Sequence, residues 1–339
     1  MHLLIPFACS SAPACVQALD TLQLPGLEKL LRRLALVQTD VAEATSLTPP
    51  HERALAQCHG MSAPDGSIAW AARESALSGR DPGKQGWAWI TPVHWDVGAD
   101  HITMADPRAL DLQQAESQSL LSAMQPYFAE DGVLLEYATP QRWLAHGEVF
   151  DDLASASLDR VAGREISAWM PRVPRLRRLQ NEMQMLLYTH PVNDARIERG
   201  LATVNSFWVS GTGRLPKNAI SVRRENATPI RPEPTVLSTV ERVEGPGSNL
   251  CRPSEVAVVD SLRDAALRDD WTAWAQAWFE LDQNECLKLL QSLDAGKNIQ
   301  LTLCGERSAL RFGPAQDGML NKLRRSFTKT TLKSLQDQL

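Results

Sequence analysis

The sequence predicts an α/β protein, and three features of the 339-residue chain predict it. An apolar stretch over 2–8 has the composition of a buried strand, and 24–36 then carries leucines at helical spacing. A strand, a short connection and a helix form the repeating unit of layered α/β folds. Further along, strand-like and helix-like runs keep alternating. With 43% hydrophobic residues, the chain is long enough for one large domain or two ordinary ones.

The first half of the chain predicts helices, strands and a hairpin in turn. Helices are expected over 24–36, 50–59 and 112–128, with a short one inside 61–86. Tryptophans alternate with other residues from position 87, which predicts two strands within 87–104 and a turn at 97–100. Two more strands are expected over 133–137 and 141–145.

The second half predicts a long helix, a boundary and a second set of strands. Leu179, Met183 and Leu187 form one apolar stripe, which predicts a helix over 176–188. Many prolines and polar residues over 221–249 predict a long flexible loop. The other expected elements are strands over 204–209, 255–259, 299–304 and 307–312, helices over 262–279 (broken near 270) and 283–293, and an amphipathic terminal helix.

These elements predict two parts: an α/β core from 1–44 and 216–339, and an inserted α+β portion over 45–215. Trp271, Trp274 and Trp278 fall on one helix face, which predicts a stripe in the core.

Composition excludes several classes of protein. The formal net charge is −5 and 22% of residues are charged, which argues against disorder and against a protein that coats nucleic acid. No apolar run approaches about 18 residues, so no membrane span is expected. The six cysteines form no C-x-x-C pair, which predicts reduced thiols in a cytoplasmic protein. Residues 1–14 have no basic region, so we interpret their apolar part, 2–8, as a buried strand rather than part of a signal peptide.

The most distinctive run of the sequence is 190–213. Asn193 or Asp194 is expected to cap a short helix that Gly200 ends. The next strand is expected to begin at Asn205 and to end in a Gly-x-Gly loop, whose backbone N–H groups can face an anion. In one interpretation, a phosphate or carboxylate binds to this set: His190, Asn193, Arg196, Asn205, Gly211 and Gly213. In the other, these residues are caps, an arginine–carboxylate clamp and a tight turn. The run matches neither a P-loop nor a dinucleotide-binding fingerprint.

A second polar cluster lies within 91–101. Its His94, Asp96, Asp100 and His101 are residue types that bind metals, and on a strand His94 and Asp96 share a face. The alternative is a polar hairpin with local hydrogen bonds, which we favour because no further ligand pair has matching spacing. We therefore predict no metal, no cofactor and no catalytic residue here.

The run over 190–213 resembles a signature of archaeal-type cofactor-independent phosphoglycerate mutases, HP-x-N-x-x-R-x-x-x-G followed by N-x-x-x-x-x-G-x-G. The matching residues are His190, Pro191, Asn193, Arg196, Gly200, Asn205, Gly211 and Gly213. The helix start at 24–30 is similar to that of the wider alkaline-phosphatase-like superfamily. Most of the chain resembles bacterial phosphoglycerate mutase-like, or RpfE-type, regulatory proteins. The resemblance lies in short sequence segments at 49–56, 91–95, 100–101, 157–161, 179–182, 188–191 and 205–208. This resemblance implies a mixed-sheet, alkaline-phosphatase-like core.

The chain departs from the mutases at the residues that carry their chemistry. Mutases of this type transfer phosphate through a serine beside two divalent metals, whose first ligand is an aspartate just after the first strand. Here Cys9, Ser10 and Ser11 follow that strand, and a late strand runs into Glu306 instead of an Asp-His pair. Without ligands for two metals, the chain has no means to activate the nucleophile or to neutralise the negative charge that develops during phosphoryl transfer.

The sequence therefore predicts a phosphoglycerate mutase-like pseudoenzyme with a regulatory role or a ligand- or partner-binding role. The alternative is an active metal-dependent mutase or phosphatase with a site rearranged around 91–101. A third alternative is a scaffold that binds a partner through the basic terminal helix and 221–249. The candidate ligand is a phosphorylated or carboxylate small molecule, and the candidate partner is another protein. Nucleic acid and membranes are not expected partners.

Overall fold

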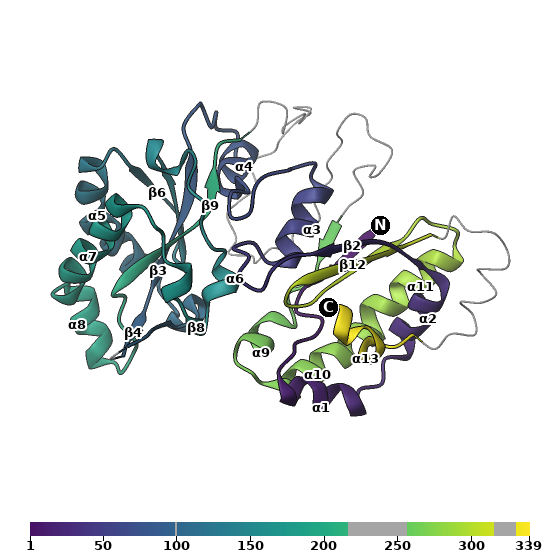
Figure 1. Ribbon diagram of the computed structural model, residues 1–339. Helices are drawn as coiled ribbons and strands as arrows, with labels where there is room; N and C mark the ends of the chain where they lie inside the picture. The colour runs from purple at the N-terminus through teal and green to yellow at the C-terminus, as the bar shows by residue number, and fades with distance from the viewer. Residues whose placement is uncertain (99, 216–255, 315–329) are drawn as a thin grey trace. The chain divides into compact units, whose positions relative to one another are not determined.

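The computed structural model describes residues 1–98, 100–215, 256–314 and 330–339 (Figure 1). Within them the chain forms two compact units. Unit 1 takes Met1–Thr45, Pro49–Gly60 and the described part of 221–339, and unit 2 takes Ser46–Thr48 and the described part of 61–220. The segment 221–249 and most of the expected terminal helix lie outside the described residues. No helix in the described ranges is both long enough and apolar enough to cross a membrane.

Unit 1 contains a five-stranded mixed sheet, which confirms the predicted α/β class with a mixed sheet. Its order is β10 (Val256–Val258), β1 (His2–Ile5), β11 (Gln300–Cys304), β12 (Ser308–Gly313) and β2 (Ala35–Val41). β1 pairs in parallel with β10 and β11, whereas β12 is antiparallel to both of its neighbours. The carboxyl ends of β10, β1, β11 and β2 therefore meet at one edge.

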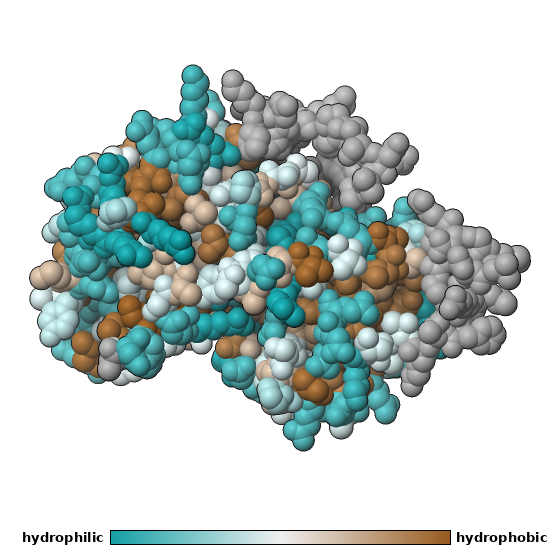
Figure 2. Space-filling view, in the orientation of Figure 1, coloured by the Kyte–Doolittle hydropathy of each residue, from teal (hydrophilic) through white to brown (hydrophobic). Residues whose placement is uncertain are grey.

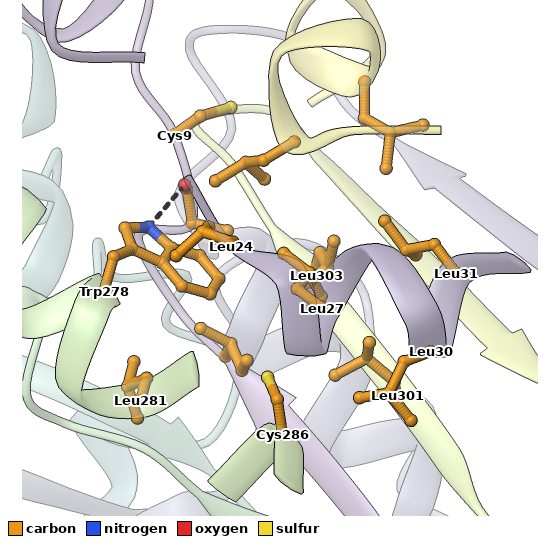
Figure 3. Packing of buried hydrophobic residues seen from close by; sticks show 14 of the residues in the cluster. Cys9, Leu24, Leu27, Leu30, Leu31, Trp278, Leu281, Cys286, Leu301 and Leu303 are labelled. Atoms are coloured by element: carbon orange, nitrogen blue, oxygen red, sulfur yellow. Dashed lines mark hydrogen bonds between the residues drawn. The ribbon is translucent and has the colours of Figure 1, made fainter. Parts of the chain in front are cut away.

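The two faces of this sheet differ in chemistry because side chains alternate along each strand. One face carries Leu3, Leu301 and Leu303, which pack in the core against helices α2, α10 and α11 (Figure 3). The other face carries His2 and Arg311 and is covered by α3. The described residues of unit 1 form the helices α1 (Pro13–Thr21), α2 (Pro25–Arg33), α3 (Pro50–Cys58), α9 (Arg263–Leu267), α10 (Trp271–Leu281), α11 (Leu287–Asp294) and α13 (Leu332–Leu335), with a 3-10 turn at Gln336–Gln338.

A buried aspartate joins two distant parts of unit 1. A π-helical turn, Asp282–Cys286, connects α10 to α11. Asp282 is fully buried, and its carboxylate accepts hydrogen bonds from the backbone N–H groups of Gly26 (3.0 Å) and Leu27 (2.7 Å) in the first turn of α2. These N–H groups have no partner within the helix, and the positive end of the helix dipole favours a carboxylate there. A Cβ at Gly26 would lie 2.9 Å from this carboxylate, so the position requires glycine.

Unit 2 is built on a four-stranded antiparallel sheet. Its order is β6 (Leu134–Thr139), β7 (Arg142–His146), β3 (Trp87–Val93) and β9 (Ser206–Gly213). Helices α5 (Gln114–Glu130) and α7 (Pro174–Tyr188) pack on one face, and α4 (Trp70–Leu77) packs on the other. A second, three-stranded sheet has the order β4 (Trp95–Val97), β5 (Ile102–Met104) and β8 (Arg164–Glu165). The remaining elements are α6 (Leu158–Val161), α8 (Pro191–Glu198) and 3-10 turns at Pro107–Leu110, Glu148–Phe150 and Ser167–Trp169.

Most predicted elements are confirmed, but β2, α1, α6 and β8 were not predicted. The helix expected over 24–36 ends at Arg33, and β2 begins two residues later. β2 lies at the edge of its sheet, and half-buried side chains alternate with exposed ones, so it lacks the apolar pattern of a strand. α1 was also not predicted, since only Cys15 and Leu19 of its nine residues are buried. On the face drawn in Figure 2, hydrophobic side chains lie in small groups among hydrophilic ones, as on most protein surfaces.

Candidate functional site

Asn193 joins three backbone groups at the start of the distinctive run. Its amide nitrogen donates to the carbonyls of Leu187 and Val204, each at 2.7 Å, and its amide oxygen accepts from the N–H of Val204 at 2.9 Å. The side chain is 2% exposed. Its principal hydrogen-bonding groups are thus used to hold the end of α7 and the chain before β9 against α8.

Arg196 is a fully buried cation held by three different groups. Its guanidinium donates to the carbonyls of Ala202 (2.7 Å) and Leu110 (2.5 Å) and to the Glu116 carboxylate (2.8 Å). Glu116 also pairs with Arg199 and accepts from the N–H of Gln113. Burial by itself raises the pKa of Glu116, but these donors and the two arginines outweigh burial and hold the pKa below its usual value. The geometry is that of an arginine–carboxylate clamp.

His190 and Asn205 also have partners within the protein. His190 caps α8, because its Nδ1 accepts from the N–H of Val192 at 3.2 Å. The expectation that Asn193 or Asp194 would be the cap is therefore wrong: an imidazole nitrogen takes that role. Burial lowers the pKa of His190 and outweighs the nearby charge of Asp194, which acts in the opposite direction. The lowered pKa favours the neutral ring, and only a neutral ring has a nitrogen that can accept the capping hydrogen bond. Asn205 bonds both backbone groups of Trp95, at 2.7 and 2.8 Å.

The expected Gly-x-Gly loop is part of a strand. β9 continues through Gly213, which pairs with Trp87 across an irregularity in the ladder. Gly211 has a φ of +63°, and a Cβ there would lie 2.7 Å from the Trp89 ring, so glycine is required for bulge geometry and close packing. Gly211 and Gly213 stand six and eight residues beyond Asn205, about 20 Å or more along a strand. The structure therefore groups His190, Asn193, Arg196 and Asn205 at one end of β9 and places the two glycines at the other.

The polar hairpin forms local hydrogen bonds. His94 Nδ1 lies 2.7 Å from the carbonyl of Thr203, and its Nε2 lies 3.2 Å from Asp96. His101 Nδ1 lies 2.9 Å from Asp100, and both side chains are exposed. Within the ranges that the structure describes, no three histidine, cysteine, aspartate or glutamate side chains are grouped closely enough to hold a metal ion. The hairpin does meet the distinctive run, through the contacts of His94 with Thr203 and of Trp95 with Asn205.

A further polar cluster lies at the end of β1, where the sequence showed only a departure from the mutase pattern. The hydroxyls of Ser10 and Ser11 both donate to the Glu306 carboxylate, each at 2.7 Å. Glu306 follows β11, so the cluster stands at the edge where the parallel strands end. One carboxylate and two hydroxyls do not fit a two-metal centre, which needs several carboxylate or imidazole ligands.

Two tryptophans hold, through hydrogen bonds, the backbone of residues 7–8, which precede these serines. Phe7 has a φ of +55°, a strained conformation for a residue with a side chain. Trp274 donates to the carbonyl of Phe7 at 2.9 Å, and Trp278 donates to that of Ala8 at 3.1 Å (Figure 3). The predicted tryptophan stripe thus belongs to the core, as expected, and also determines the path of residues 7–8. No local pattern in the sequence predicts these long-range hydrogen bonds.

Two solved structures are among the distant structural neighbours of the chain. The cofactor-independent phosphoglycerate mutase from Thermoplasma acidophilum DSM 1728 is 14% identical, with a TM-score of 0.35, and the match covers 100% of this chain and 98% of that one. The PH0037 protein from Pyrococcus horikoshii is 11% identical, with a TM-score of 0.46, and the match covers 98% of this chain and 91% of that one. No family model and no curated protein matches the chain.

The five-stranded sheet of unit 1 is mixed, as expected of the α/β core that the sequence predicts. Because both TM-scores are below 0.5, we infer function from this chain's own residues.

Proposed function

We propose that this protein is a phosphoglycerate mutase-like protein that lacks the two-metal chemistry and has a regulatory or binding role in the cytoplasm. The observation that carries the proposal is the cluster at the end of β1. Where the resemblance calls for the first metal-binding aspartate, Ser10 and Ser11 donate to Glu306 instead. A serine becomes a nucleophile when a base or a metal activates it, and a single carboxylate that already accepts both hydroxyls is a weak base.

The distinctive run supports the same proposal. The four polar side chains at one end of β9 bond to backbone groups or to Glu116, so they are used to build unit 2. A sequence can keep such a run for stability after catalysis has been lost. A phosphorylated or carboxylate ligand, or a protein partner, would then bind elsewhere on the protein.

The direct test is a mutase assay. The purified protein, incubated with manganese and 3-phosphoglycerate, is expected to form no 2-phosphoglycerate above the enzyme-free blank, while an active mutase under the same conditions does. Manganese-dependent turnover that is lost in Ser10→Ala or Ser11→Ala would identify a serine nucleophile and overturn the proposal.

The alternative of a rearranged active site makes a separate prediction. If the hairpin holds a catalytic metal, the native protein contains stoichiometric metal, and His94→Ala loses it. We expect metal analysis of the native protein to find less than about 0.1 equivalent. His146→Ala is the matched control, because His146 contacts Gln85 rather than the hairpin. Stoichiometric metal that only His94→Ala removes would favour the alternative.

A further inference from the structure

A buried polar cluster lies under α3, on the sheet face opposite the main core of unit 1. Cys58, near the end of α3, places its sulfur 3.4 Å from Nδ1 of His2 and 3.7 Å from Nη2 of Arg311. The other ring nitrogen of His2 lies 2.7 Å from the Thr302 hydroxyl. His2, Arg311 and Thr302 are each at least nine-tenths buried, whereas Cys58 is partly exposed.

The arrangement is that of an activated thiol. A sulfur within hydrogen-bond distance of an imidazole and of a guanidinium, with the imidazole held by a third group, has donors that can stabilise a thiolate. A thiolate at Cys58 can only accept hydrogen bonds, so Nδ1 of His2 would donate to it and Nε2 would accept from Thr302. Arg311 supplies a second donor and a positive charge, which favours the thiolate.

The neutral form of His2 suits this role. Burial, together with the positive charges of Arg311 and the amino terminus, lowers the pKa of His2 to about 3. The ring therefore stays neutral, and in the tautomer that carries its proton on Nδ1 it donates to the sulfur, while the proton of the thiol leaves to water. Arg311, Arg53, Asp40 and Cys58 also act on the neighbouring Cys304, so an acidic side chain as well as two arginines lie near this part of the sheet.

The other cysteines of the described residues lie in environments that disfavour the thiolate. Cys9, Cys15, Cys286 and Cys304 are all buried. Burial is the main cause that raises their pKa values, to about 12 for Cys9, about 11 for Cys15 and about 12 for Cys286, and raises that of Cys304 as well. A thiolate is the reactive form, so these four are expected to be inert.

We propose that Cys58 is a nucleophilic thiol and a site of covalent modification by small carbon electrophiles. In the reaction with iodoacetamide, the sulfur forms a bond to the methylene carbon, the carbon–iodine bond breaks, iodide leaves and the thiol proton goes to water. The adduct would stand between α3 and the sheet. This inference does not depend on the proposed function.

The test compares the alkylation rate of each cysteine in the native protein and in urea at pH 7, by peptide mass spectrometry. We expect Cys58 to react at least about tenfold faster than the four buried cysteines, and several-fold faster in the native protein than in urea. Exposure alone cannot produce the second result, because an unfolded chain exposes a cysteine completely. A Cys251→Ser background removes the cysteine outside the described residues.

The pH dependence separates activation from simple access. In urea the rate should rise about tenfold per pH unit below the ordinary thiol pKa of about 8.5. Between pH 6.5 and 7.5 the native rate at Cys58 should rise less than about threefold. Arg311→Gln should make the profile steeper, whereas Arg307→Gln, which removes an exposed arginine, should leave it unchanged.

A native Cys58 that reacts more slowly than in urea, with a tenfold rise per pH unit, would overturn the proposal. These two measurements on the unaltered cluster decide the question even if Arg311→Gln does not fold.

Discussion

Arg196→Met is expected to lower the free energy of unfolding by about 3–5 kcal/mol, the usual cost of removing one partner from a buried ion pair. The guanidinium is fully buried and bonds the carbonyls of Leu110 and Ala202 as well as Glu116. Methionine fills much of the volume but donates no hydrogen bond, so both buried carbonyls lose a partner. Urea denaturation followed by circular dichroism measures the change.

Arg199→Met is the matched control. Arg199 pairs with the same carboxylate, but its side chain is 50% exposed, so its loss should cost less than about 1 kcal/mol. The pair of variants also tests the two interpretations of the 190–213 run. If Arg196→Met leaves stability unchanged but abolishes the stabilisation that inorganic phosphate gives to the native protein, Arg196 binds an anion and the structural interpretation fails.

Asp282→Asn is expected to lower the free energy of unfolding by about 2–4 kcal/mol, since charge-assisted hydrogen bonds are worth about 1.5–3 kcal/mol each. The asparagine side chain offers one acceptor where two N–H groups of α2 need one each. Its NH₂ group would face a donor in a fully buried position. Thermal or urea unfolding of the two proteins gives the comparison.

Asp270→Asn provides the control for this substitution. Asp270 caps α10 by accepting from the N–H of Ala273, but it is exposed, and asparagine caps a helix about as well as aspartate. Its cost should stay within about 0.5 kcal/mol. Equal effects of the two substitutions would show that burial of the Asp282 carboxylate is not what matters.

The confirmed predictions rest on local patterns. The stripe of Leu179, Met183 and Leu187 predicted α7, because a helix that buries one face must repeat its apolar residues with the period of the helix. Tryptophans at every second position predicted β3 through the two-residue period of a strand, although this strand is buried on both faces. β2 was missed for the same reason: as an edge strand it buries too little on either face to show a pattern.

The candidate site could be predicted only in part. The sequence identified the 190–213 run and the residues after the first strand as unusual. It left open whether Arg196 would meet a ligand or a carboxylate, because Glu116 lies 80 residues away. The placement of two glycines inside β9 likewise depends on the ladder with β3 and on the ring of Trp89.

The sequence by itself therefore determined the α/β class, most helices and strands, and the absence of the expected aspartate after the first strand. Only the tertiary structure decided that Ser10 and Ser11 meet Glu306, that Asp282 caps a helix 255 residues away, and that Cys58 meets His2 and Arg311. The physical reason is that periodicity records which side of an element is buried, whereas a polar side chain's partner depends on which elements pack together.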